Sequence, residues 1–156
     1  MNDKSHFERE VREQPEVLRA LLADETLRRA AHDLARSGLR IVLTLARGSS
    51  DNAVTFFSYL AGLYLGVPVA SLPPSLFSVY GSTLRLGDAL ALGVSQSGES
   101  SDVVEGLAAL RAAGATTLAL SNDPASSLAR AADYALEQHA GREQAVAASK
   151  TFSSQM

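Results

Sequence analysis

The residues best suited to bind a ligand form a short run of hydroxyl and amide side chains. Ser95, Gln96, Ser97 and Ser100 lie close together, with Gly98 among them. Neutral donors placed before a helix, whose first amides have no internal partner, are typical of an anion site. The sequence carries neither a Walker lysine motif nor a Gly-x-Gly-x-x-Gly motif, so a nucleotide is not the expected ligand. The alternative is that these serines only cap a helix and shape a turn.

A second hydroxyl-rich turn carries Ser49 and Ser50 and follows the apolar run at residues 40–46. The first turn follows a similar run at residues 89–94, which is typical of a strand buried on both faces of a parallel sheet. Ligands of such sheets bind beyond the carboxyl ends of the strands, where the strand order reverses. If the two runs are neighbouring strands, both turns face one crevice, which favours a phosphate or other oxyanion site.

Apolar runs that alternate with helical segments predict a parallel sheet covered on both faces. The predicted strands are residues 40–46, 67–72, 89–94, 116–120 and 134–136. The predicted helices are residues 7–22, 24–37, 53–65, 101–113 and 126–132, with a last one beginning at Ala145. Pro15 argues against an unbroken first helix, because proline lacks a backbone donor. We expect a flavodoxin-like three-layer αβα fold, with five parallel strands in the order 2-1-3-4-5, over residues 39–156. A helical arm, residues 1–38, precedes it.

Composition excludes several classes of function. The 156 residues carry a net charge of −3 without a basic stripe, so we expect no nucleic-acid partner. The chain has no cysteine, which excludes disulfides and thiolate chemistry and favours the cytoplasm. Its three histidines, His6, His32 and His139, are scattered, so we expect no metal site. We likewise expect no cofactor and no association with a membrane.

The segment from Gly48 to Leu84 has Asp51 as its only charged residue. So few charges indicate that its helix and strand are buried or form a subunit interface, and we expect a homodimer. Three further apolar residues of this segment either belong to the core or face a partner, and the core is the favoured interpretation because isolated aromatic side chains usually pack inside. They are Phe77, Val79 and Tyr80.

Several motifs occur in the order found in SIS (sugar isomerase) domains, which this chain resembles from about residue 40 to residue 156. The motifs are Arg47-Gly48-Ser49-Ser50, Ser95-Gln96-Ser97-Gly98-Glu99-Ser100, Ser121-Asn122 with Ser126-Ser127-Leu128, and Ala140-Gly141-x-Glu143-x-x-Val146-Ala147-Ala148-Ser149-Lys150. The similarity is greatest to the isomerase part of glucosamine-6-phosphate synthases and to the aminosugar-phosphate isomerases and deaminases that lack a glutaminase domain.

The resemblance implies a ligand and its contacts. The ligand is a hexose phosphate or an amino-hexose phosphate, of the fructose-6-phosphate or glucosamine-6-phosphate type. The residues that match positions holding its phosphate or hydroxyl groups are Ser50, Ser95, Gln96, Ser97 and Ser100, with Ser49 in the same first turn. Glu99 is expected to order its loop rather than take part in chemistry. Asp123 and Ser100 depart from the synthase pattern.

Members of this type carry two SIS domains, with the acid and base residues in the second, and nothing in this chain matches those residues. The chain therefore resembles a first domain that is cut within its last helix. Glu143 and Lys150 are its local candidates for proton transfer at C1 and C2. A role at a domain interface is favoured for both. Two functions stay open: the binding half of an isomerase or deaminase, and a non-catalytic module that senses a phosphosugar.

Overall fold

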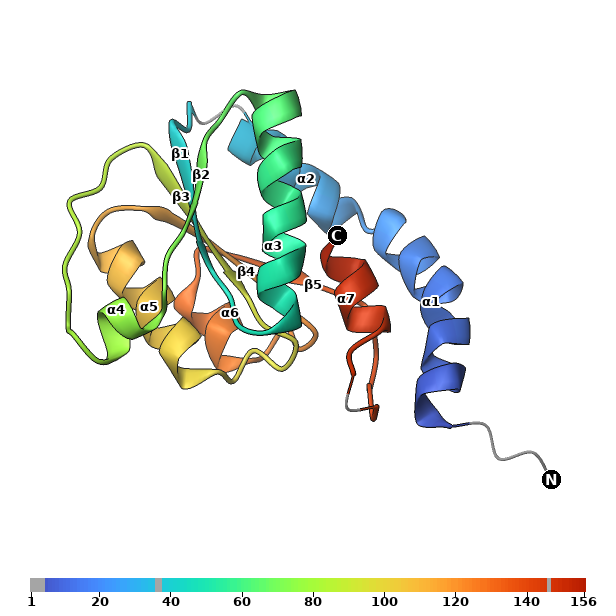
Figure 1. Ribbon diagram of the computed structural model, residues 1–156. Coiled ribbons are helices and arrows are strands. Elements are labelled where there is room, and N and C mark those ends of the chain that lie inside the picture. The colour runs from blue at the N-terminus through green and yellow to red at the C-terminus, as the bar shows by residue number, and fades with distance from the viewer. Residues whose placement is uncertain (1–4, 36–37, 146) are drawn as a thin grey trace.

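The structure is a computed structural model that describes residues 5–35, 38–145 and 147–156. Its sheet is all parallel and consists of β1 (Ile41–Leu45), β2 (Val69–Ser71), β3 (Ala89–Val94), β4 (Thr116–Ser121) and β5 (Tyr134–Glu137). The strand order is β2-β1-β3-β4-β5, which confirms the order expected from the sequence (Figure 1).

Helices cover the two faces of this sheet, which confirms the expected three layers. They are α1 (His6–Leu22), α2 (Glu25–Ala35), α3 (Ser49–Leu60) with its π-helical continuation η1 (Ala61–Leu65), α4 (Ser75–Ser78), α5 (Ser101–Ala112), α6 (Ser127–Ala131) and α7 (Lys150–Gln155). Helices α4, α5 and α6 lie on one face, and α2 and α3 lie on the other (Figure 1). None of the described helices is long and apolar enough to cross a membrane. Residues 1–4 of the arm, the predicted helix end at Ser37, and Val146 lie outside the described residues.

The core consists of two apolar clusters separated by the sheet. Successive side chains of a strand point to opposite faces. Leu43 and Ala91 accordingly join the cluster beneath α5, whereas Val42 and Leu90 join the cluster beneath α2 and α3. All residues of β3 are buried, as its continuous apolar run predicts. The central strands are therefore packed on both faces, and the loops that follow begin at their well-packed carboxyl ends.

Helix α1 is continuous through Pro15, so the expected interruption is wrong. The missing backbone donor costs one hydrogen bond, but contacts on the preceding turns hold the helix in place. Glu10 is buried and accepts hydrogen bonds from the backbone of residues 144 and 145, and Glu13 pairs with Lys150. Tertiary contacts thus outweigh the local preference of proline.

Two helices begin several residues away from the position predicted from sequence. Helix α3 begins at Ser49 rather than at residue 53, because Gly48 takes a positive φ of 59° and lets the chain turn directly into the helix. Helix α7 begins at Lys150 rather than at Ala145. The backbone amide of Ala145 bonds to the carboxylate of Glu10 and is not part of a helix.

The interpretation of the aromatic segment as core is correct only in part. Phe77 is buried against α5, whereas Val79 and Tyr80 are 72% and 78% exposed. Helix α4 has a single turn, so only one side of it faces the core. Val79 is the C-cap of this helix and Tyr80 follows it, so both lie beyond the turn that packs on the core.

Replacing Pro15 with alanine is expected to raise the free energy of unfolding by about 2 kcal/mol. A proline inside a helix costs about 3 kcal/mol, and the greater freedom of the unfolded alanine chain offsets up to about 1 kcal/mol of this gain. Urea unfolding followed by circular dichroism measures the difference. Glu16→Ala, an exposed change on the same helix, serves as the control. An unchanged or lower free energy would contradict the prediction.

Candidate functional site

A cleft of about 280 Å³ opens beyond the carboxyl ends of β1 and β3. These strands are direct neighbours, with Leu45 paired to Gly93 near their ends. The structure brings together all six residues that the sequence proposed for ligand binding. The lining residues are Arg47, Gly48, Ser49, Ser50, Val94, Ser95, Gln96, Ser97 and Ser100.

The first turn of α3 forms one wall of the cleft. Gly48 precedes this helix, and the side chain of Ser50 is buried in its first turn. The first amides of a helix have no intrahelical acceptor and carry partial positive charge. Helix α3 therefore offers backbone donors and the Ser49 and Ser50 hydroxyls at the same wall.

The loop between β3 and α5 forms the opposite wall, and its own hydrogen bonds fix its shape. The hydroxyl of Ser95 accepts from the backbone of Gly98 at 3.2 Å and lies 3.3 Å from the hydroxyl of Ser100. The hydroxyl of Ser97 accepts from the backbone of Glu99 at 3.2 Å. Because Ser100 is the N-cap of α5, a second helix begins beside the cleft. Two helix N-termini and several hydroxyls thus converge on one small volume, an arrangement suited to a phosphate group.

Glu99 orders this loop, as expected, and does not line the cleft. Its carboxylate accepts hydrogen bonds from the backbone and the hydroxyl of Ser127 at 2.8 and 2.7 Å. These bonds lower the pKa of the Glu99 carboxyl, so the carboxylate stays ionised and engaged with α6. The backbone of Leu128 also donates to the carbonyl of Gly98 at 2.9 Å. The loop is therefore tied to α6 on the side away from the cleft.

Glu143 and Lys150, the two local candidates for proton transfer, are engaged in structural contacts. The Glu143 carboxylate accepts from the backbone of Ser149 and Lys150 at 2.6 and 2.9 Å, and from the hydroxyl of Thr151. Partial burial raises the pKa of the Glu143 carboxyl, but the hydrogen bonds from Thr151, Ser149 and Lys150 outweigh it and lower that pKa. Lys150 is 4% exposed, and its ammonium lies 2.6 Å from the carboxylate of Glu13. Neither residue lines the cleft.

Arg47 also lines the cleft. It belongs to one of the SIS motifs, but it was not among the residues predicted from the sequence to bind the ligand. Its guanidinium pairs with the carboxylate of Asp102 on the first turn of α5, and its side chain is 65% exposed. It brings a positive charge to a cleft otherwise lined by neutral groups. Its position directly before Gly48, in a segment almost without charge, is the signal that identifies it from sequence.

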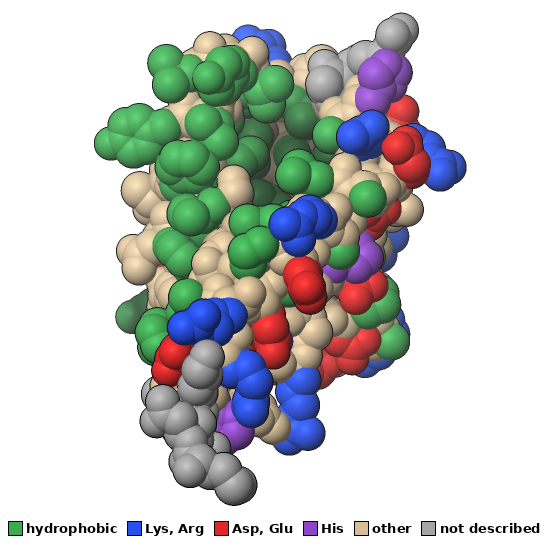
Figure 2. Space-filling model, turned by 90° about the vertical axis from the view of Figure 1, so that its right-hand side faces the viewer, with side chains coloured by type: hydrophobic (Ala, Val, Ile, Leu, Met, Phe, Trp, Pro, Cys, Tyr) green, Lys and Arg blue, Asp and Glu red, His purple; other side chains and the backbone are tan. Residues whose placement is uncertain are grey.

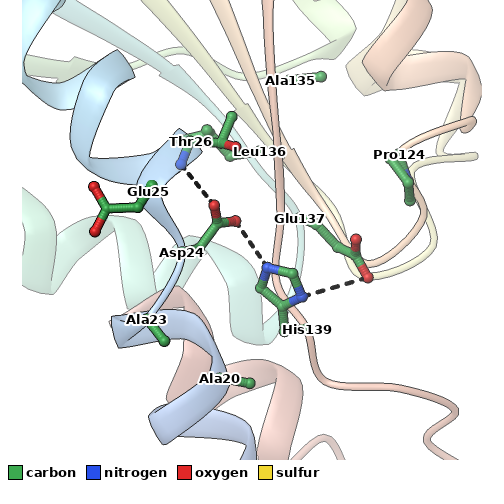
Figure 3. A pocket seen from close by; sticks show the side chains of 10 residues that line it. All are labelled: Ala20, Ala23, Asp24, Glu25, Thr26, Pro124, Ala135, Leu136, Glu137 and His139. Carbon is green, nitrogen blue, oxygen red and sulfur yellow. Dashed lines mark hydrogen bonds and ion pairs between the residues drawn. The ribbon is translucent and has the colours of Figure 1, made fainter.

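A larger pocket of about 630 Å³ lies elsewhere, between the arm and β5 (Figure 3). His139 occupies its centre, with one ring nitrogen 2.8 Å from Asp24 and the other 3.7 Å from Glu137. The bond to His139, together with one from the backbone of Thr26, lowers the pKa of Asp24 to about 2. Carboxylates line this pocket, so it disfavours a phosphate. The pocket lies where α2 meets the sheet. Among the described residues, no group of three or more His, Asp or Glu side chains is placed to hold a metal ion.

The SIS domain family matches residues 34–156 of this chain. The glutamine–fructose-6-phosphate aminotransferase of Aquifex aeolicus is 32% identical over 154 residues, covering 95% of this chain and 25% of that enzyme. The aminotransferase of Aeropyrum pernix is 36% identical over 155 residues, covering 94% of this chain and 24% of that enzyme. The chain thus spans about a quarter of the length of these curated relatives.

Two solved structures share the fold closely. A protein of Silicibacter pomeroyi, for which phosphosugar isomerase activity has been suggested, superposes with a TM-score of 0.94 at 45% identity and covers 97% of this chain. The C-terminal domain of the glucosamine-fructose-6-phosphate aminotransferase of Francisella tularensis superposes with a TM-score of 0.84 at 28% identity and covers 99% of this chain. The chain spans 47% and 45% of these two structures.

Gly98→Ala is expected to lower the free energy of unfolding by about 2–4 kcal/mol. Its φ is +69°, and a β-carbon there would lie 2.3 Å from the hydroxyl of Ser126, so backbone strain and overpacking add together. Gly66→Ala is the matched control: its φ is +65° and its ψ is 22°, in the left-handed helical region, and no atom lies within 4 Å of the added carbon. The control should therefore lose only about 1–2 kcal/mol. Equal losses in urea unfolding would contradict the close packing of the loop on α6.

Proposed function

This chain belongs to the SIS domain family, and we propose that it forms the phosphosugar-binding half of an aminosugar-phosphate isomerase or deaminase. The ligand is a hexose phosphate of the fructose-6-phosphate or glucosamine-6-phosphate type. The observation that carries this proposal is the cleft beyond β1 and β3, where six hydroxyl and amide residues meet two helix N-termini. The relatives named for fructose-6-phosphate support the choice of sugar.

Hydroxyls, backbone amides and one guanidinium of the cleft are placed to bind such a ligand. The phosphate oxygens accept hydrogen bonds from the hydroxyls of Ser50, Ser95 and Ser97 and from the first amides of α3 and α5. Arg47 stays paired with Asp102 and offers its remaining N–H donors and its positive charge to the phosphate at the rim. The cleft is smaller than the usual range of about 300–1,000 Å³ for ligand pockets. Its volume still exceeds that of a phosphate group, so part of the sugar enters the cleft with the phosphate.

Isomerisation requires a base beside C1 and C2 of the sugar. No carboxylate is among the residues that line the cleft in the described part of the chain, and Glu143 is saturated with hydrogen bonds. We therefore propose that residues 39–156 bind the substrate, that residues 1–38 form an arm, and that a second domain supplies the base. The enzyme works in the cytoplasm, in keeping with a chain without cysteine.

The absence of a carboxylate from this lining also favours a second candidate, a non-catalytic module that senses a phosphosugar. Solvent deuterium entering C2 of the sugar phosphate separates the two, because only an isomerase or deaminase catalyses this exchange. The exchange would be followed by proton NMR on the chain together with its second domain.

Calorimetric titration with glucosamine-6-phosphate tests the binding site. We expect saturable binding with a Kd on the order of tens of micromolar to millimolar. Ser97→Ala and Arg47→Met should each weaken it about tenfold, since a hydrogen bond to a charged group contributes about 1.5–3 kcal/mol. Ser58→Ala, the same chemical change outside the cleft, should leave the Kd unchanged. The assignment fails if the folded wild-type chain does not bind, or if Ser97→Ala and Arg47→Met bind as well as the wild type.

We propose further that the chain forms a homodimer through α3 and η1. Hydrophobic side chains gather on one side of the face shown in Figure 2. The exposed apolar residues of α3 and η1, here called the α3–η1 patch, are Phe56, Tyr59, Leu63, Tyr64 and Leu65. A largely uncharged helical surface of this kind suits a two-fold contact with a second copy of itself.

Sedimentation velocity is expected to give a mass near twice the 16.4 kDa of the chain. Leu63→Glu should give a monomer, because it places a charge in the centre of the α3–η1 patch. Glu105→Gln, which alters an exposed charge on α5, is the control and should stay dimeric. A wild-type chain that sediments as a monomer at about 100 μM, a concentration at which even micromolar dimers form, rules out this interface.

A further inference from the structure

Glu10 is a buried carboxylate on α1 whose partners lie in a distant part of the chain. The side chain is 2% exposed, and it accepts hydrogen bonds from the backbone of Gln144 at 2.5 Å and of Ala145 at 3.2 Å. A buried carboxylate is tolerated only where donors satisfy it, so these contacts fix the position of the segment.

A second contact fixes the same part of the chain to the same helix. Lys150, the first residue of α7, is buried and places its ammonium 2.6 Å from the carboxylate of Glu13. Helix α7 packs against both α1 and α3, so it lies between the arm and the wall of the cleft (Figure 1). The arm therefore holds the segment 143–150, which is described apart from Val146, near both of its ends.

The held segment reaches the ligand cleft through Glu143. One oxygen of this carboxylate accepts from the backbone of Ser149 and Lys150, and the other accepts from the side-chain amide of Gln96 at 3.4 Å. Asn122 adds a second link: its backbone donates to the carbonyl of Gln96 at 3.0 Å, and its side chain accepts from the backbone of Ala140 at 2.9 Å.

From these contacts we propose that Glu10 and Glu13 of the arm are positioning residues for the ligand site. They act by holding segment 143–150, so that Glu143 orients the amide of Gln96 over the cleft. A Gln96 side chain without this support samples several rotamers, and binding must then order it at an entropic cost. The arm is in this way part of the binding site, although it does not line the cleft.

This inference rests on the proposed phosphosugar site, so its test includes one measurement that needs no ligand. In nitrogen-15 NMR spectra of the full chain, the side-chain amide of Gln96 is assigned by its loss in Gln96→Ala. Glu10→Ala is expected to shift that signal, whereas Glu16→Ala, on an exposed part of α1, should leave it in place. Glu10→Gln keeps an acceptor and should give an intermediate shift. An unmoved Gln96 signal in a folded Glu10→Ala chain overturns the proposal.

A double-mutant cycle then tests the coupling with glucosamine-6-phosphate as the probe. Glu10→Ala should weaken binding about fivefold in the wild-type chain, and much less in a Gln96→Ala background, where the residue it positions is gone. Glu13→Gln should behave in the same way. Equal effects of Glu10→Ala in both backgrounds would show that the arm acts by another route.

The possible failures can be told apart. If the wild-type chain does not bind the sugar phosphate, the proposed function fails, and the NMR experiment still decides whether the arm positions Gln96. If Glu10→Ala does not fold, Glu10→Gln and Glu13→Gln replace it in both measurements. A folded variant that keeps both the wild-type signal of Gln96 and the wild-type affinity overturns the inference alone.

Discussion

The parallel pairing of β1 with β3 is the constraint on which the site depends. Two strands that follow one another in the sheet, but not in the chain, end side by side, and each continues into a helix. The N-termini of α3 and α5 therefore point into the same crevice. Their dipoles and free amides add together there. In the part of the chain that the structure describes, no other pair of neighbouring strand ends leads into two helices of this length. The hydroxyl side chains refine a site that the topology creates.

Much of this arrangement was predictable from sequence, because it depends on signals that are local or set by strand topology. A continuous apolar run identified β3, and the expected strand order placed Ser50 and Ser97 at one cleft. The choice among possible anions is different in kind. Spacing alone predicted an oxyanion site, and only the SIS motifs specified a sugar phosphate.

Three of the failures share one physical cause, which is a contact between residues far apart in the chain. Pro15 should break a helix by its local chemistry, but buried contacts on the preceding turns of α1 keep the helix whole. The alanine-rich stretch after Gln144 has the composition of a helix, yet the amides of Gln144 and Ala145 bond to Glu10, more than a hundred residues earlier. Arg47 was not recognised as part of the cleft, because its pairing with Asp102 depends on the position of α5.

The proposed anion site lies in a chain of net charge −3, so the carboxylates near it must be engaged by donors of their own. Three acidic residues around the cleft have their own donors: Glu99 bonds to α6, Asp102 pairs with Arg47, and Glu143 bonds to the start of α7. None of the three carboxylates lines the cleft, and each is held on its own donors. They also tie the loop to its neighbours. The same carboxylates that would repel a bound anion therefore hold the loops of the proposed site in position.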